Sequence, residues 1–182
     1  MKTNKVILLP YIKNAIDNKY QLGEITILEE TNIDDKGNQF EMKVNIKKGK
    51  GQTLLVCRFD VKEDLFPYFQ NKEGYKKNCD YIVFAESAAK LYVFLVELKD
   101  SQESPQRQLY VSKTFAEFII SRIKVVEDNM PDKEIIYKMI GIKKKARKKS
   151  TKGFEDDYKF EDDYLLLPNP KCMDLDKIID HI

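Results

Sequence analysis

The sequence predicts an α/β fold, a three-layer sandwich in which a central mixed sheet is flanked by helices. Two observations predict it. Asp80–Glu86 and Leu91–Leu98 carry apolar residues on both faces, which is typical of strands in the middle of a covered sheet. Ser104–Val126 then has apolar residues at helical spacing, and Glu134–Ile142 follows as a further strand.

The first third of the chain predicts a short helix and then an antiparallel meander. In Pro10–Tyr20 apolar residues recur at helical spacing, and a proline suits the first turn of a helix. Glu24–Glu30, Gln39–Lys47 and Thr53–Val61 alternate in polarity or are apolar throughout, with glycine-containing turns between them. We expect three strands of one meander that precedes the core.

The centre of the chain predicts a hairpin followed at once by the long helix. Ser87–Lys90 is expected to form the turn between the two apolar strands. Ser104 is expected to cap the helix, with Pro105 at its first position, where the missing amide hydrogen costs nothing.

The chain has the length of one domain, because 182 residues suffice to bury a sizeable core without disulfides. We expect the core at roughly residues 58–142. Residues 143–182 are expected to form a C-terminal extension, with a strand at Tyr158–Leu167 and a helix from Asp174.

Several classes of protein are excluded by the residues that are scarce. The three cysteines are far apart and odd in number, which predicts neither a disulfide framework nor a zinc site and fits a reducing cytoplasm. The single histidine, His181, stands next to the last residue, which argues against serine triads and histidine-based general bases. No apolar run approaches the roughly 20 residues of a membrane span, so a cytoplasmic protein without a membrane partner is expected.

Three chemically useful side chains are expected to meet at one end of the hairpin. A turn centred between Ala88 and Ala89 places Asp80 opposite Glu97, and Lys99 shares the face of Glu97 because residues two apart on a strand point the same way. Opposed carboxylates repel each other, so the pair calls for a cation or a proton.

A hard divalent ion would neutralise the two carboxylates. Mg²⁺ accepts two carboxylate oxygens, a main-chain carbonyl and several waters, and Lys99 beside it could hold or deprotonate an attacking water. The structural alternative is a salt bridge between Glu97 and Lys99 at the strand end, with Asp80 capping a turn.

These residues resemble the core of the PD-(D/E)XK nuclease superfamily, with its restriction-endonuclease-like fold. The resemblance covers roughly residues 58–122 and rests on Cys79–Val83, on Val96–Lys99 and on Gln108 with Leu109 in the following helix. A cysteine stands where the superfamily motif has proline.

The resemblance implies a role for each motif residue. Asp80 and Glu97 would bind Mg²⁺, with Mn²⁺ as an alternative, and the Leu98 carbonyl would be a further ligand. Lys99 would serve the nucleophilic water, and Gln108 corresponds to a glutamine that some members use, although an ordinary helix-surface glutamine is the alternative.

The acidic residue that many members of the superfamily carry on their first helix has no clear counterpart. Asp17 stands in the expected helix, and Glu24 and Glu63 are substitutes. The sequence therefore leaves open whether one metal ion or two would bind.

The resemblance also implies a function for one nuclease-like domain over residues 1–182. We expect a metal-dependent nuclease that hydrolyses DNA, or alternatively RNA, in restriction, repair or defence, acting as a homodimer or within a larger defence or repair complex. The alternative is a catalytically silent, nuclease-like subunit that binds nucleic acid or serves as a scaffold.

A basic run is the last feature of interest. Its residues could track a phosphate backbone: Lys143, Lys144, Lys145, Arg147, Lys148 and Lys149. The acidic block at residues 155–163 follows directly, so a solvated loop that this block partly neutralises is the alternative.

Overall fold

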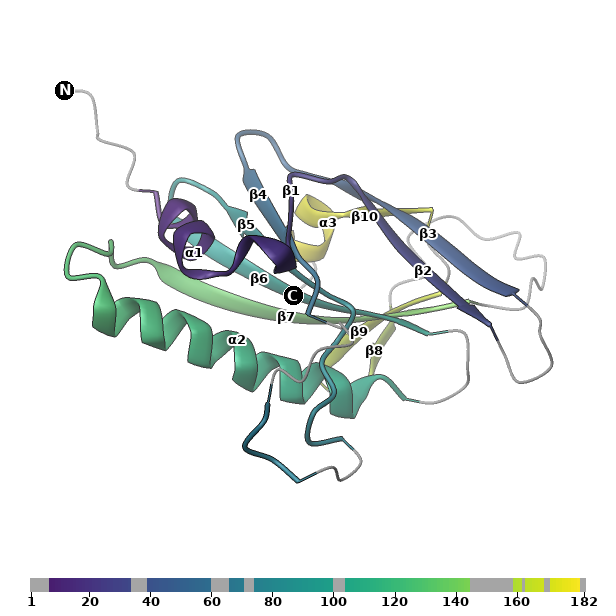
Figure 1. Ribbon diagram of the computed structural model, residues 1–182. Helices are drawn as coiled ribbons and strands as arrows, with labels where there is room; N and C mark the ends of the chain where they lie inside the picture. Colours follow the sequence, from purple (N-terminus) through teal and green to yellow (C-terminus); the bar gives the residue numbers. More distant parts are fainter. Residues whose placement is uncertain are drawn as a thin grey trace.

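The computed structural model describes residues 7–33, 39–59, 66–70, 74–99, 104–144, 159–161, 163–168 and 171–180. They form two sheets with helices packed against them (Figure 1). The larger sheet contains, in spatial order, β1 (Gln21–Gly23), β4 (Thr53–Cys57), β5 (Tyr81–Glu86), β6 (Lys90–Lys99), β7 (Glu134–Lys143), β9 (Tyr164–Pro168) and β8 (Lys159–Glu161). The smaller sheet contains β10 (Cys172–Asp174), β3 (Gln39–Lys47) and β2 (Ile27–Ile33).

The larger sheet is mixed, as the sequence predicted. β6, β7 and β9 are parallel, whereas the other neighbours pair antiparallel. The helix α2 (Gln106–Val126) connects the parallel strands β6 and β7, which is the usual crossover between parallel neighbours. Pro105, not Ser104, is the N-cap residue of α2 and makes no side-chain cap bond, so the predicted cap is wrong by one position. The Ser104 hydroxyl still accepts a hydrogen bond from the Gln106 amide at 3.3 Å.

Both faces of the larger sheet are buried. One face packs against α2 and the short helix α1 (Leu9–Ala15), which a 3-10 turn at Asn18–Tyr20 follows. The opposite face packs against the smaller sheet and the helix α3 (Leu175–Asp180). No helix in the described part of the chain is long and apolar enough to cross a membrane.

The predicted three-stranded meander is wrong. β2 and β3 pair antiparallel, but β4 leaves them and pairs with β1 and β5 in the larger sheet. The burial pattern gives the reason. In β3 buried and exposed residues alternate, as in a sheet with one solvated face, whereas β4 is buried at every position after Thr53 and so suits a sheet covered on both faces.

The C-terminal part of the chain contributes strands to both sheets. The single strand expected at residues 158–167 is an antiparallel pair, β8 and β9, and β9 extends the larger sheet beside β7. Further on, β10 pairs parallel with β3. The expected terminal helix begins one residue later than predicted, at Leu175.

A buried ion pair holds the turn end of the β5–β6 hairpin. The Lys133 ammonium lies 2.6 Å from a Glu86 carboxylate oxygen, and both side chains are almost fully buried. The same carboxylate accepts hydrogen bonds from the amides of Leu8 and Leu9 at the start of α1. Glu86 therefore joins the hairpin, α1 and the segment before β7.

Replacing Lys133 by Met should lower the free energy of unfolding by about 3 kcal/mol, because the Glu86 carboxylate stays buried after losing its cation. Urea denaturation measures the change. Lys48→Met is the control, since its partner Glu24 is exposed and such pairs contribute under about 1 kcal/mol. Equal losses in the two variants would contradict this assignment.

Candidate active site

The hairpin register brings the predicted reactive residues together. Tyr81 pairs with Val96, so the next position along places Asp80 opposite Glu97, as the sequence predicted. The Leu98 amide donates to Asp80 Oδ2 at 2.6 Å, and the Asp80 amide donates to Glu97 Oε2 at 3.2 Å. Each carboxylate therefore accepts a hydrogen bond from a main-chain amide on the other side of the hairpin.

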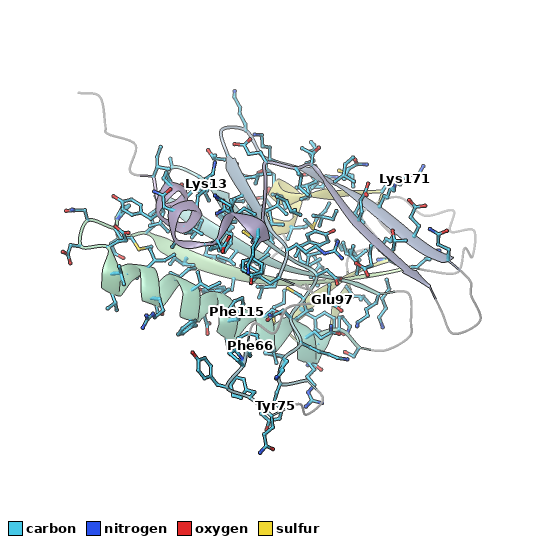
Figure 2. The ribbon with its side chains drawn as sticks, in the orientation of Figure 1. Lys13, Phe66, Tyr75, Glu97, Phe115 and Lys171 are labelled. Atoms are coloured by element: carbon cyan, nitrogen blue, oxygen red, sulfur yellow. The ribbon has the colours of Figure 1, made fainter. Side chains whose placement is uncertain are left out.

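The cluster lies on the face of the sheet that α2 covers. In β6 the alternate residues Leu91, Val93 and Leu95 belong to the core packed against α2, and Glu97 and Lys99 continue that alternation. Asp80 is 6 % and Glu97 2 % exposed, and Figure 2 shows Glu97 within the molecule. These carboxylates are therefore held in an interior environment.

Lys99 provides a positive charge at the same place. Its ammonium lies 2.8 Å from Glu97 Oε1, and its side chain retains 18 % exposure, so it reaches from the buried carboxylate toward solvent. The alternative interpretation, in which Glu97 and Lys99 form only a stabilising salt bridge at the strand end, includes this ion pair as well. Asp80, however, does more than cap a local turn, because its carboxylate bonds across the hairpin to the Leu98 amide.

Ionised carboxylates are oxygen ligands for hard cations. Each ionised carboxylate offers about four lone-pair sites. Oxygen donors of this kind suit magnesium, which takes few protein ligands and completes its shell with waters or phosphate oxygens. In the described residues there is no group of three or more acidic, cysteine or histidine side chains placed to hold a metal.

The start of α2 is tied to the segment before Asp80. The Cys79 amide donates to the Ser112 hydroxyl at 2.6 Å, and this hydroxyl donates to the Gln108 carbonyl at 2.8 Å. Gln108 itself is half-buried. Its main chain is therefore fixed at the level of the site, and the role of its side chain stays a prediction, as does that of the Leu98 carbonyl.

The buried cysteines are unsuited to nucleophilic chemistry. Burial raises the pKa of Cys79, and the nearby charges of Glu97 and Asp80 raise it further, although the hydrogen bond with Ser112 lowers it. Burial likewise raises the pKa of Cys57 to about 12. Both thiols stay protonated at neutral pH, so neither is an activated nucleophile.

The residues considered for a second metal are engaged elsewhere or not described. Asp17 accepts the Lys19 amide at 3.0 Å and caps the 3-10 turn, and the exposed Glu24 pairs with Lys48. Glu63 lies outside the described residues.

The basic run begins beside the site. Lys143 ends β7 in register with Lys99, and the amide of Lys144 donates to the Lys99 carbonyl at 3.0 Å. The remaining predicted phosphate contacts, Lys145, Arg147, Lys148 and Lys149, lie outside the described residues.

Sequence reasoning missed a buried amide next to the cluster. Asn78 is 4 % exposed, and neither its side-chain oxygen nor its nitrogen has a hydrogen-bond partner in the part of the chain that the structure describes. An unpartnered buried amide is costly, and this one stands two residues before Asp80. No periodicity in the sequence marks this residue, because its burial depends on tertiary packing.

Comparison of the chain with protein-family models, with curated proteins and with solved structures found no match.

Gly141 makes room for the start of α2 beside the site. It pairs with Glu97 in the register of β6 and β7, and a Cβ atom added to it would lie 2.5 Å from Pro105 Cγ. The glycine therefore allows the residue before α2 to contact the sheet next to the buried carboxylate.

Gly141→Ala should lower the free energy of unfolding by about 1–3 kcal/mol through overpacking against Pro105. Urea denaturation of the double variant Pro105→Ala/Gly141→Ala is the matched test, because Pro105→Ala removes the Cγ atom that the Cβ introduced at position 141 would meet. The double variant should regain most of the free energy of unfolding that Gly141→Ala loses. A double variant that falls by the sum of both single losses would show that this contact does not set the position of α2.

Proposed function

We propose that the chain is a metal-dependent nuclease that hydrolyses phosphodiester bonds in DNA, with RNA as the alternative substrate, and that Asp80, Glu97 and Lys99 form its reactive centre. The observation that carries the proposal is the convergence of two buried carboxylates and one partly exposed lysine at the end of a covered hairpin. Restriction, repair or defence are the settings that the resemblance implies.

The topology supports a restriction-endonuclease-like, three-layer assignment. Helix α1 is followed, after the insertion of β2 and β3, by the antiparallel neighbours β4, β5 and β6, then by α2 and the parallel strand β7. This is the order of helix, antiparallel strands, long helix and strand that the sequence led us to expect. Glu97 and Lys99 lie on the central strand β6, and Asp80 directly precedes β5.

Asp80 and Glu97 are the residues that would hold the metal ion, with Mg²⁺ preferred and Mn²⁺ as the alternative. A bound magnesium ion supplies Lewis-acid stabilisation of the negative charge on the phosphate and lowers the pKa of water. The unpartnered amide of Asn78 supports a polar ligand at this end of the sheet, since it offers one donor group and one acceptor to a water or a phosphate.

The placement of Lys99 supports a role in positioning a water molecule. The contact with Glu97 fixes one of its three donor directions, and the partial exposure of its side chain leaves it accessible to a substrate that approaches from solvent. Lys143, which pairs with Lys99 at the end of β7, adds positive charge beside it and favours an approaching phosphate backbone.

Asp80→Asn and Glu97→Gln should each abolish magnesium-dependent cleavage of plasmid and single-stranded DNA while the fold persists. The amide side chains can still accept the hydrogen bonds from Leu98 and Asp80, but they lack the charge that holds the cation. Glu134→Gln is the matched control, because it makes the same carboxylate-to-amide change at an exposed position on β7. This variant should cleave normally. Nucleic-acid binding without cleavage by the unmodified chain, alone or with its partner proteins, would instead indicate the catalytically silent alternative.

Lys99→Arg separates the chemistry of the lysine from its charge. Arginine keeps the charge but replaces a compact ammonium by a planar, permanently protonated group, so single-turnover cleavage at saturating magnesium should fall by about 100-fold or more, as on losing a positioned proton-transfer group. Lys99→Ala should be similarly slow. Near-normal rates for Lys99→Arg would leave Lys99 as a structural partner of Glu97.

A further inference from the structure

An aromatic cavity of about 580 Å³ lies outside the carboxylate cluster, between α2 and the segments 66–70 and 74–75. Figure 2 shows Phe66 and Tyr75 on the loop that projects beneath α2, with Phe115 nearby. The principal lining residues are Phe66, Phe69, Tyr75, Arg107, Phe115 and Phe118. The volume falls in the usual range for small-ligand sites.

The rings that line this cavity pack against one another and still remain accessible to solvent. Phe66 contacts Phe115 edge-on with centroids 5.1 Å apart, and Phe69 lies 5.8 Å from Tyr75. Phe69, Tyr75 and Phe118 nevertheless remain 48 %, 52 % and 58 % exposed. Large exposed rings gathered at one concave place are typical of a binding surface rather than of a core.

Positive charge accompanies the rings. Arg107 lines the cavity, and its guanidinium packs closely on Gly74, whose φ of +88° suits glycine and whose added Cβ would lie 2.8 Å from Arg107 Cζ. Lys76 and the exposed Lys77 directly follow Tyr75 in the chain. The matching ligand therefore combines a flat apolar ring with an anionic chain, which is the chemistry of a nucleotide.

The cavity and the carboxylate cluster are joined by one short segment that α2 holds at both ends. Gly74 packs on Arg107, and the Cys79 amide bonds to Ser112 one helical turn further along. Even fully extended, the five Cα–Cα steps from Tyr75 to Asp80 span at most about 18 Å. Lys76 and Lys77 lie on this segment, so two basic residues stand between the cavity wall and the cluster along the chain.

We propose that this cavity takes one unpaired base of a single-stranded nucleic acid, stacked on its aromatic rings, with Arg107, Lys76 and Lys77 on the adjoining phosphates. A paired base cannot enter, because its faces are stacked within the duplex. The inference rests on the proposed function and deepens it, since it names single-stranded or locally unpaired nucleic acid as the substrate class. An apolar side chain of a protein partner would use the rings but not the positive charge.

A fluorescence titration tests the base-stacking step directly. The sequence contains no tryptophan, so Tyr75→Trp gives the full-length chain a single reporter in the cavity wall. In EDTA, a short oligothymidine should quench this emission, whereas an abasic oligonucleotide of the same length should not. Equal effects of the two oligonucleotides, or none, would overturn the proposal and leave an apolar protein ligand as the better account of the rings.

Affinity measurements on alanine variants provide the second readout. Phe69→Ala and Phe118→Ala should each weaken binding of labelled oligothymidine by at least about fivefold, the lower limit for loss of one base-stacking contact. Val125→Ala, an exposed change on α2 outside the cavity, should bind like the unmodified chain. Unchanged affinity in both aromatic variants would refute the assignment.

Metal-free conditions keep this test separate from the proposed cleavage. Base-dependent binding without any magnesium-dependent cleavage would contradict the nuclease proposal while supporting the cavity. Cleavage that persists without base-dependent binding would contradict the cavity alone.

Discussion

The pairing of β5 with β6 is the constraint on which the candidate site depends. Tyr81 pairs with Val96, and the same register carries the Leu98 amide to the Asp80 carboxylate. A slip by one residue would turn the side chains of one strand to the opposite face and separate the two carboxylates. Both strands are buried on both faces, so any slip would also place polar groups in the core. Core packing and the geometry of the site are therefore fixed together.

The two ends of this hairpin show how the protein buries carboxylates for different purposes. At the turn end, Glu86 is matched by Lys133 and two main-chain amides, and joins separate segments of the fold. At the open end, Asp80 and Glu97 meet beside Lys99, and each carboxylate accepts a hydrogen bond from a main-chain amide. Two like charges placed together disfavour ionisation unless cations compensate them. The proposed metal ion would supply such compensation in addition to Lys99.

The sequence was most informative where the structural information is local. The hairpin, the helix that follows it and the strand at residues 134–142 could be predicted because alternation, helical spacing and turn residues lie within each segment. The antiparallel pairing of β2 with β3 was also expected, but the third strand of the smaller sheet was not, because β10 comes from the far end of the chain. The contact of Cys79 with Ser112, the burial of Asn78 and the aromatic cavity likewise depend on how α2 packs, which no single segment encodes.

The central claim is that the opposed carboxylates form a site for a hard divalent cation. Calorimetric titration with magnesium chloride tests it without reference to any substrate. Binding by the unmodified chain should be lost in both Asp80→Asn and Glu97→Gln and retained in Lys99→Arg, because the ligands are the carboxylates. Undiminished magnesium affinity in both carboxylate variants would contradict the claim.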